Sequence, residues 1–166
     1  MGLFKEKKQE ASAYHLGQGL IQVVRGSTSN KLFEKLQVKS WRETGEFICG
    51  ALWAAWIGIC KSGLEHPISD SVLEGMKSMI TDPKIYGYVG GVVNDRIKEY
   101  NDLMYQSPSD HPLLLVSKRF IEQVKSVDSE LVQDVFGYME ISILLAAITG
   151  VVINTLKAAQ EEYEIV

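Results

Sequence analysis

The chain of 166 residues has little cysteine, little proline and no strong excess of charge of either sign. If its two cysteines, Cys49 and Cys60, lie in one helix, they are roughly 16 Å apart along the axis and cannot form a disulfide with each other. We therefore expect two free thiols in a reducing compartment. The net charge of -4 argues against specific nucleic-acid binding, because Lys and Arg contacts to phosphate supply most of that affinity.

Other familiar signals are absent as well. The first eight residues contain no apolar signal-peptide core, so we expect a cytoplasmic protein. The sequence has no pair of histidines spaced for zinc on one helix, no Glu-x-x-His pair and no phosphate-binding glycine motif. Together these absences favour a protein that is not an enzyme.

The positions of the four prolines favour an all-α fold. Pro67, Pro83, Pro108 and Pro112 all lie in polar breaks, and none interrupts an apolar periodic stretch. No stretch alternates apolar and polar residues for long enough to require a strand. We expect one all-α globular domain, residues 1–166, a compact bundle of about six helices.

The helix signals divide the chain in a consistent way. Ser40 and Glu43 fit a capping box, so the stretch about 31–62 is either one bent helix or two. A glycine at position 63 is suited to ending it. The other expected helices cover about 3–24, 69–80 (capped by Ser69, Asp70 or Ser71), 83–105, 112–126 and 130–160, the last capped by Asp128 or Ser129.

Two segments are apolar on nearly every side, residues 47–60 and 141–153. Such helices must be surrounded by other helices or by lipid, and about fourteen residues are too few to span a bilayer. We therefore expect no membrane-spanning segment, and helices about 45–62 and 130–160 at the centre of the bundle. Their small-residue rows, one containing Ala54 and the other Ala146, predict a close crossing near these two residues.

An acidic pattern gives one alternative. Asp95, Glu99 and Asp102 share one helical face, and Glu43 and Glu46 form an ExxE pair elsewhere. The combination of ExxE with the ExxD at 99–102 resembles the acidic signature of all-α nucleoside-triphosphate pyrophosphohydrolases, although residues 47–98 separate the two fragments by more than that family's pattern does. The resemblance implies a metal-dependent nucleotide hydrolase that binds Mg²⁺ through these five carboxylates.

Aromatic residues give a second alternative. Trp53 and Trp56 are three residues apart on one helical face, where they could line an apolar pocket between helices. A small apolar ligand is the partner that such a pocket predicts. A haem-type sensor would need only one histidine as ligand, and the chain has His15, His66 and His111.

No catalytic grouping stands out from its structural explanation. The sequence therefore favours a non-enzymatic helical protein-interaction or regulatory module that associates with a protein partner or with itself as a homo-oligomer. The apolar excess supports this interpretation, because part of it can form an interface.

Overall fold

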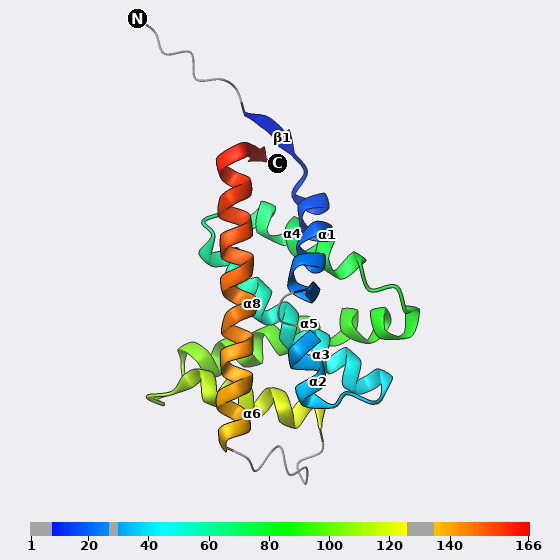
Figure 1. Ribbon diagram of the computed structural model, residues 1–166, viewed down its shortest axis with the longest axis vertical. Coiled ribbons are helices and arrows are strands. Elements are labelled where there is room, and N and C mark those ends of the chain that lie inside the picture. Colours follow the sequence, from blue (N-terminus) through cyan, green and yellow to red (C-terminus); the bar gives the residue numbers. More distant parts are fainter. Residues whose placement is uncertain (1–7, 27–29, 126–134) are drawn as a thin grey trace, which may run out of the picture.

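The computed structural model describes residues 8–26, 30–125 and 135–166. It confirms the all-α fold: seven helices and one pair of very short strands account for most of the described chain (Figure 1). The elements are β1 (Gln9–Ala11), α1 (Ala13–Val24), α2 (Asn30–Leu36), α3 (Trp41–Lys61), α4 (His66–Ser78), α5 (Pro83–Tyr105), α6 (Pro112–Val124), α8 (Val135–Glu162) and β2 (Tyr163–Ile165).

The stretch 31–62 forms two helices, and the reason is the predicted capping box. The Ser40 hydroxyl accepts a hydrogen bond from the Glu43 amide (3.1 Å), and the Glu43 carboxylate accepts one from the Ser40 amide (3.3 Å). Both bonds satisfy amides that the first turn of α3 leaves without helical partners. The other end of α3 is followed by Gly63, whose positive φ of 85° suits glycine and ends the helix there.

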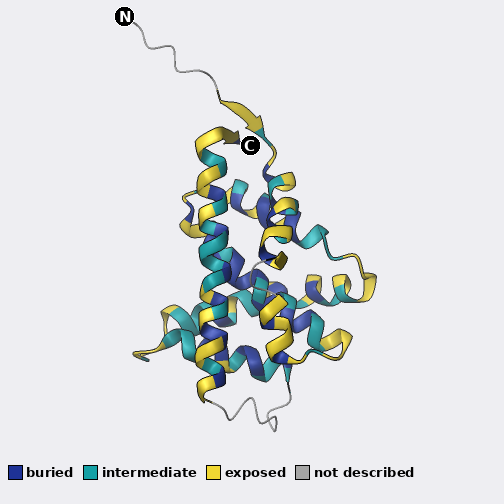
Figure 2. Ribbon diagram, viewed as in Figure 1, coloured by how far each residue is buried: buried dark blue, intermediate teal, exposed yellow. Residues whose placement is uncertain are grey.

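Helix α3 is the centre of the molecule. Helices α4, α5, α6 and α8 all pack against it, and 12 of its 21 residues are buried. Figure 2 shows buried residues gathered in the middle of the molecule, where these helices meet. Its small residues admit two different neighbours. A Cβ atom added to Gly50 would lie 2.3 Å from the Phe120 ring of α6, and one added to Gly58 would lie 2.8 Å from the Thr149 carbonyl oxygen of α8.

Helix α8 packs on α3 with one face only. The buried residues include Ile141, Leu145, Ile148, Val152 and Leu156. The predicted partner of Ala54 was wrong: Ala146 is exposed, and Ala54 instead accepts a hydrogen bond at its carbonyl from the Thr149 hydroxyl (2.8 Å). The stripe that contains Ile141, Leu145 and Ile148 therefore packs inward, while Ala146 lies outside it. Helix α3 has buried residues on every side, whereas α8 does not.

Helices α1 and α4 cross where a glycine of each helix contacts the backbone of the other. A Cβ atom added to Gly17 would lie 2.0 Å from the carbonyl oxygen of Val72, and one added to Gly75 would lie 2.0 Å from that of Tyr14. No side chain fits in either place, so these two glycines allow the helices to touch through their backbones.

Two expected helix starts are corrected. The first helix begins at Ala13, capped by Ser12, rather than near residue 3; residues 9–11 form β1, which pairs in parallel with β2, and residues 3–7 lie outside the described chain. Helix α4 begins at His66 rather than at Ser69–Ser71, because Pro67 occupies its first turn. The expected cap at Asp128 or Ser129 also lies outside the described residues.

Candidate functional site

Glu46, on α3, is a carboxylate buried in the core, with 1% of its surface exposed. Arg96 of α5 binds it with two hydrogen bonds, from Nε to Oε2 (2.8 Å) and from Nη2 to Oε1 (2.7 Å). The Tyr88 hydroxyl donates a third to Oε1 (2.5 Å). Gly45 leaves space for that tyrosine, since a Cβ there would lie 2.5 Å from the Tyr88 ring. This geometry joins α3 to α5 through a fully paired charge.

The same guanidinium also contacts Glu99. Arg96 Nη1 lies 3.3 Å from Glu99 Oε2, and Arg119 of α6 donates from Nε to Glu99 Oε1 (2.5 Å). The structure thus brings Glu46 and Glu99 to either side of one arginine. Glu46 and Glu99 both belong to the predicted metal site, and in the structure the guanidinium of Arg96 lies between them.

The other three acids of the predicted metal site are separated. Glu43 caps α3 and pairs with Lys125 (3.0 Å), and Asp102 pairs with Lys98 (2.7 Å). Asp95 is exposed on α5 and lines one shallow hollow with Glu99 and Asp102. Lys98 and Arg119 line this hollow as well, so its charge is mixed.

Hydrogen bonding keeps these carboxylates ionised. Burial alone would raise the pKa of Glu46, but the hydrogen bonds from Arg96 and Tyr88 and the charge of Arg96 outweigh it, and the net pKa lies below the ordinary value. The pKa of Glu43 is lowered as well, because the amide of Lys39 and the ammonium of Lys125 outweigh its desolvation. Neither group is suited to act as a proton donor near neutral pH.

Within residues 8–26, 30–125 and 135–166, no three side chains of His, Cys, Asp or Glu are grouped so that they could hold a metal ion. The magnesium site stays a prediction. What the structure supports at these residues is an ion-pair network that fixes α3, α5 and α6 relative to one another.

The two tryptophans have different surroundings. Trp53 is buried, donates from Nε1 to the Asn101 side chain (2.9 Å) and packs edge-on against Tyr100. Trp56 is partly exposed, with its ring 6.3 Å from the His66 ring, and it lines a shallow hollow that includes Asn101. His66 also pairs with Asp70 (3.0 Å).

The main apolar cavity lies on another side of α3, between α1, α2, α3 and α4. It measures about 270 Å³, and its walls include Ile21, Val24, Phe33, Phe47, Ile48 and Ala51. Arg25, Asn30 and Thr44 supply its polar lining. Neither Trp53 nor Trp56 borders this cavity, so the structure and the sequence place an apolar pocket at different residues.

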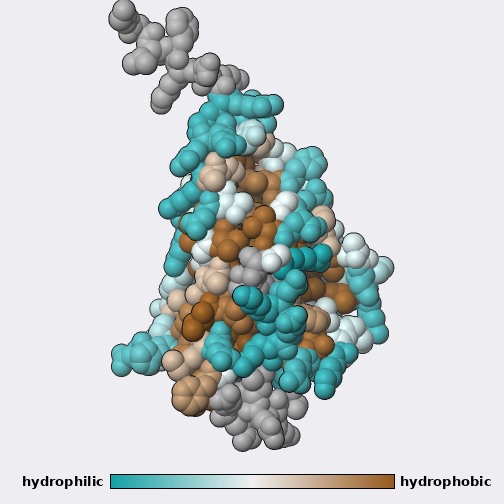
Figure 3. All heavy atoms as spheres, viewed as in Figure 1, coloured by the Kyte–Doolittle hydropathy of each residue, from teal (hydrophilic) through white to brown (hydrophobic). Residues whose placement is uncertain are grey.

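Sequence reasoning missed the outer face of α8. Met139 and Ile143 are 48% and 66% exposed, and no charged side chain occurs in residues 141–156. Figure 3 shows hydrophobic residues gathered along this helix, with hydrophilic residues beside them. The available signal was the helical period, which places Ile143 on the side of α8 opposite Ile141, Leu145 and Ile148.

By length and composition alone, α8 could cross a membrane, and it is the one helix of the described chain that passes this test. Its buried stripe, however, packs against α3 and α6. A helix at the surface of a water-soluble bundle with a second apolar face would satisfy the same criteria.

No family model, curated protein or solved structure matches the chain.

Proposed function

We propose that the chain is a non-enzymatic helical module that acts through protein contact, and that its contact surface is the outer face of α8, occupied by a second copy of the chain. The observation that carries this proposal is the exposure of Ile143 and Met139 on a helix whose opposite face is buried. Large apolar side chains gathered on one exposed face mark interaction sites.

A second copy fits this face better than lipid does. Asn154 and the charged residues Glu140 and Lys157 also lie on the exposed side of α8. Transfer of these groups from water to hydrocarbon would cost several kcal/mol by the order of magnitude of polar-group transfer. A protein surface can supply hydrogen bonds and opposite charges.

We also propose that the protein is cytoplasmic, as the sequence leads us to expect. Cys49 and Cys60 are both free thiols. Burial raises the pKa of the Cys49 thiol to about 12, so that it is protonated and unreactive at neutral pH.

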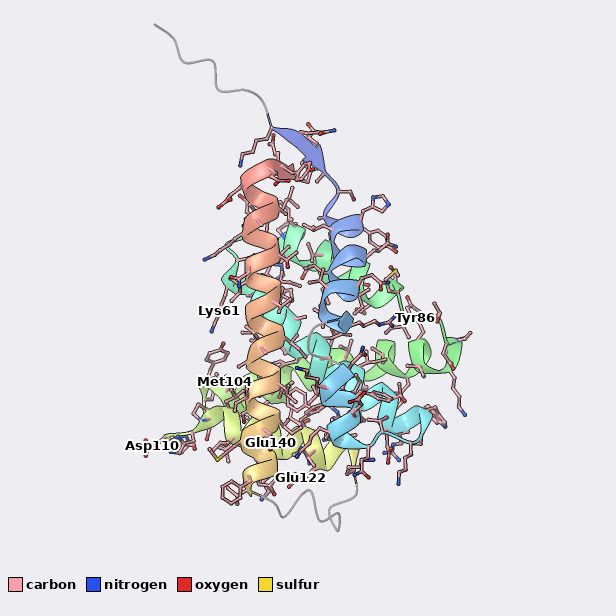
Figure 4. All side chains as sticks on the ribbon, viewed as in Figure 1. Lys61, Tyr86, Met104, Asp110, Glu122 and Glu140 are labelled. Carbon is pink, nitrogen blue, oxygen red and sulfur yellow. The ribbon has the colours of Figure 1, made fainter. Side chains whose placement is uncertain are left out.

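Sedimentation velocity of the purified chain over a concentration series tests the proposal. We expect a reversible dimer for the wild type and a monomer for Ile143→Glu, with an unchanged thermal unfolding curve in the dilute variant. The matched control is Tyr86→Glu, which introduces the same charge at an exposed aromatic residue on α5, far from Glu140 on α8 (Figure 4). This control should dimerise as the wild type does.

Flotation with phosphatidylcholine vesicles separates the two occupants. A wild-type chain that stays in the aqueous fraction and dimerises supports the proposal. A wild-type chain that is monomeric at every concentration, and that floats with vesicles unless Ile143 is replaced by Glu, would overturn it in favour of a lipid-binding face.

The apolar cavity supports a second candidate function, the binding of a small amphiphile. Its walls are apolar, and Arg25 is the basic residue at its lining, a combination that suits a short acyl chain with a carboxylate end. Decanoate should raise the melting temperature of the wild type. It should have no such effect on Ala51→Phe, which fills the cavity, and should still stabilise Tyr86→Glu, in which the cavity is intact. A wild type that does not respond to decanoate excludes this class of ligand.

A further inference from the structure

The outer face of α8 has the spacing of a coiled-coil seam. Six residues recur at alternating intervals of three and four, and we call them the outer seam: Glu140, Ile143, Ala147, Gly150, Asn154 and Lys157. Alternation of three and four is the repeat that keeps one stripe of a helix against a neighbouring helix. At about 100° per residue, this seam lies opposite the buried stripe that faces α3.

The middle of the outer seam permits close approach. Gly150 has no atom of a neighbouring element within 4 Å of the position that a Cβ would take, in contrast to Gly58 beneath the same helix. Ala147 and Gly150 are half-buried between the flanking side chains, whereas Ile143 and Asn154 are exposed. Two helices can therefore meet here with small residues at the centre and a larger side chain on either side.

The order of residues along the seam is complementary to its own reverse. Measured from the midpoint between residues 148 and 149, Ala147 is as far from it as Gly150. Ile143 is likewise matched with Asn154, and Glu140 with Lys157. A two-fold axis through this midpoint, perpendicular to α8, would place each residue opposite its match in the second copy.

We infer that two copies of the chain pair through the outer seam with their α8 helices antiparallel, so that Glu140 of each copy faces Lys157 of the other. This inference rests on the proposed function, because it needs a second copy on that face. Glu140 pairs through Oε2 with Lys35 of its own chain, and its side chain is 56% exposed, so the carboxylate is accessible to a second cation.

The parallel arrangement is disfavoured by the same residues. It would place Glu140 opposite Glu140 and Lys157 opposite Lys157, and like charges directly opposed weaken an interface. It would also bring the bulky Ile143 side chains together while the glycines met each other, which fills the seam unevenly. Charge and shape thus both select the antiparallel pair.

Cysteine pairing between two differently tagged chains tests the orientation. Both chains contain Cys60→Ser, which removes the exposed thiol, and keep Cys49, which is fully buried. One chain also contains Ile143→Cys and the other Asn154→Cys. In the antiparallel pair these two positions are opposed, whereas two copies of residue 143 lie about 16 Å apart along the axis.

We expect the mixture to give a disulfide between the two tags and the Ile143→Cys chain alone to give almost none. Self-linking of the Ile143→Cys chain, or a dimer in solution whose mixture does not link, would overturn the antiparallel inference and leave the proposed function standing. A chain that is monomeric in solution would remove both.

Charge reversal gives an independent measure of the pairing. Glu140→Lys and Lys157→Glu should each weaken dimerisation by about ten-fold, because two-fold symmetry places every altered contact in the interface twice. The double variant should recover to within about three-fold of the wild type, since the opposite charges meet again. Thermal unfolding of each dilute variant serves as the control for the Lys35 contact, and a double variant weaker than both single variants would contradict the inferred pairing.

Discussion

Helices α3 and α8 contain the two long apolar runs of the sequence, residues 47–60 and 141–153, but the fold buries these runs to different extents. Buried residues occur on every side of α3, and even its acid Glu46 is 1% exposed. Helix α8 buries one stripe and exposes the other, with Ile143 66% exposed. Equal apolarity along the sequence therefore does not mean equal enclosure.

The difference shows what each helix contributes. A Cβ atom added to Gly50 or Gly58 of α3 would meet atoms of α6 or α8, so these glycines provide space for packing within one chain. On the outer side of α8, Gly150 has no atom of a neighbouring element within 4 Å of the position that a Cβ would take. We interpret α3 as the helix that organises the fold and α8 as the helix that connects the fold to a second copy.

The largest expected difference in stability is between variants of two acids, Glu46 of α3 and Glu140 of α8. Glu46→Gln removes the charge that pairs with Arg96 within the core, and we expect a loss of about 3 kcal/mol in the free energy of unfolding, the low end for a broken buried pair. Glu140→Gln on α8, measured at a dilution where the chain is monomeric, should cost less than about 1 kcal/mol because its pair is exposed. Urea unfolding measures both, and equal losses would contradict the contrast between the helices.

The same comparison can be made with alanines. Ala54→Leu adds volume at a fully buried position of α3 and should cost about 1–3 kcal/mol. Ala146→Leu makes the identical change at an exposed position of α8 and should alter the unfolding free energy by less than about 0.5 kcal/mol. Thermal unfolding of the two variants separates these expectations, and a destabilised Ala146→Leu would show that this position is packed in the monomer.

Lowering the pH should weaken the contacts of Glu46 on α3. The pKa of Glu46 is lowered below its ordinary value of 4.5 in the folded chain. A carboxyl whose pKa is lowered by folding stabilises the protein above its unfolded pKa, and this stabilisation is lost as the pH falls through the folded pKa. Below about pH 4.5, the free energy of unfolding should therefore decrease as the pH is lowered. The decrease should be less steep in Glu46→Gln. An identical acid profile in the variant would exclude Glu46 as a source of this dependence.

The smallest effect concerns a polar atom in the core beside α3. The Tyr100 hydroxyl is buried and has no hydrogen-bond partner, while its ring packs against Trp53 and Phe120. Tyr100→Phe keeps the ring and removes the unsatisfied hydroxyl, so we expect a gain of about 1 kcal/mol in stability. A loss of stability in calorimetry would mean that this hydroxyl has a partner such as a buried water.

Local chemistry made much of the fold predictable. Ser40 and Glu43 identified the start of α3, and Asp82 with Pro83 identified the start of α5, because capping depends on neighbours in sequence. The strand pair at the two termini was missed because each strand has three residues, too few for a pattern. The start of α4 was missed because Pro67 lies inside its first turn without a side-chain cap.

The candidate sites were less predictable, since they depend on contacts distant in sequence. The spacing of the acids placed Asp95, Glu99 and Asp102 on one helical face, and in the structure they line one hollow. The spacing could not show that Arg96 and Arg119 bind Glu99. The apolar pattern of residues 141–153 could not show which side α3 covers. Only the tertiary arrangement distinguishes the buried stripe from the outer seam.

Small-angle X-ray scattering of the wild-type chain over a rising concentration series tests the central claim most directly. We predict that the mass derived from the forward scattering rises to that of two chains, with dimensions that fit two bundles joined along antiparallel α8 helices. A mass equal to one chain at every concentration would contradict the claim that a second copy covers the outer face of α8.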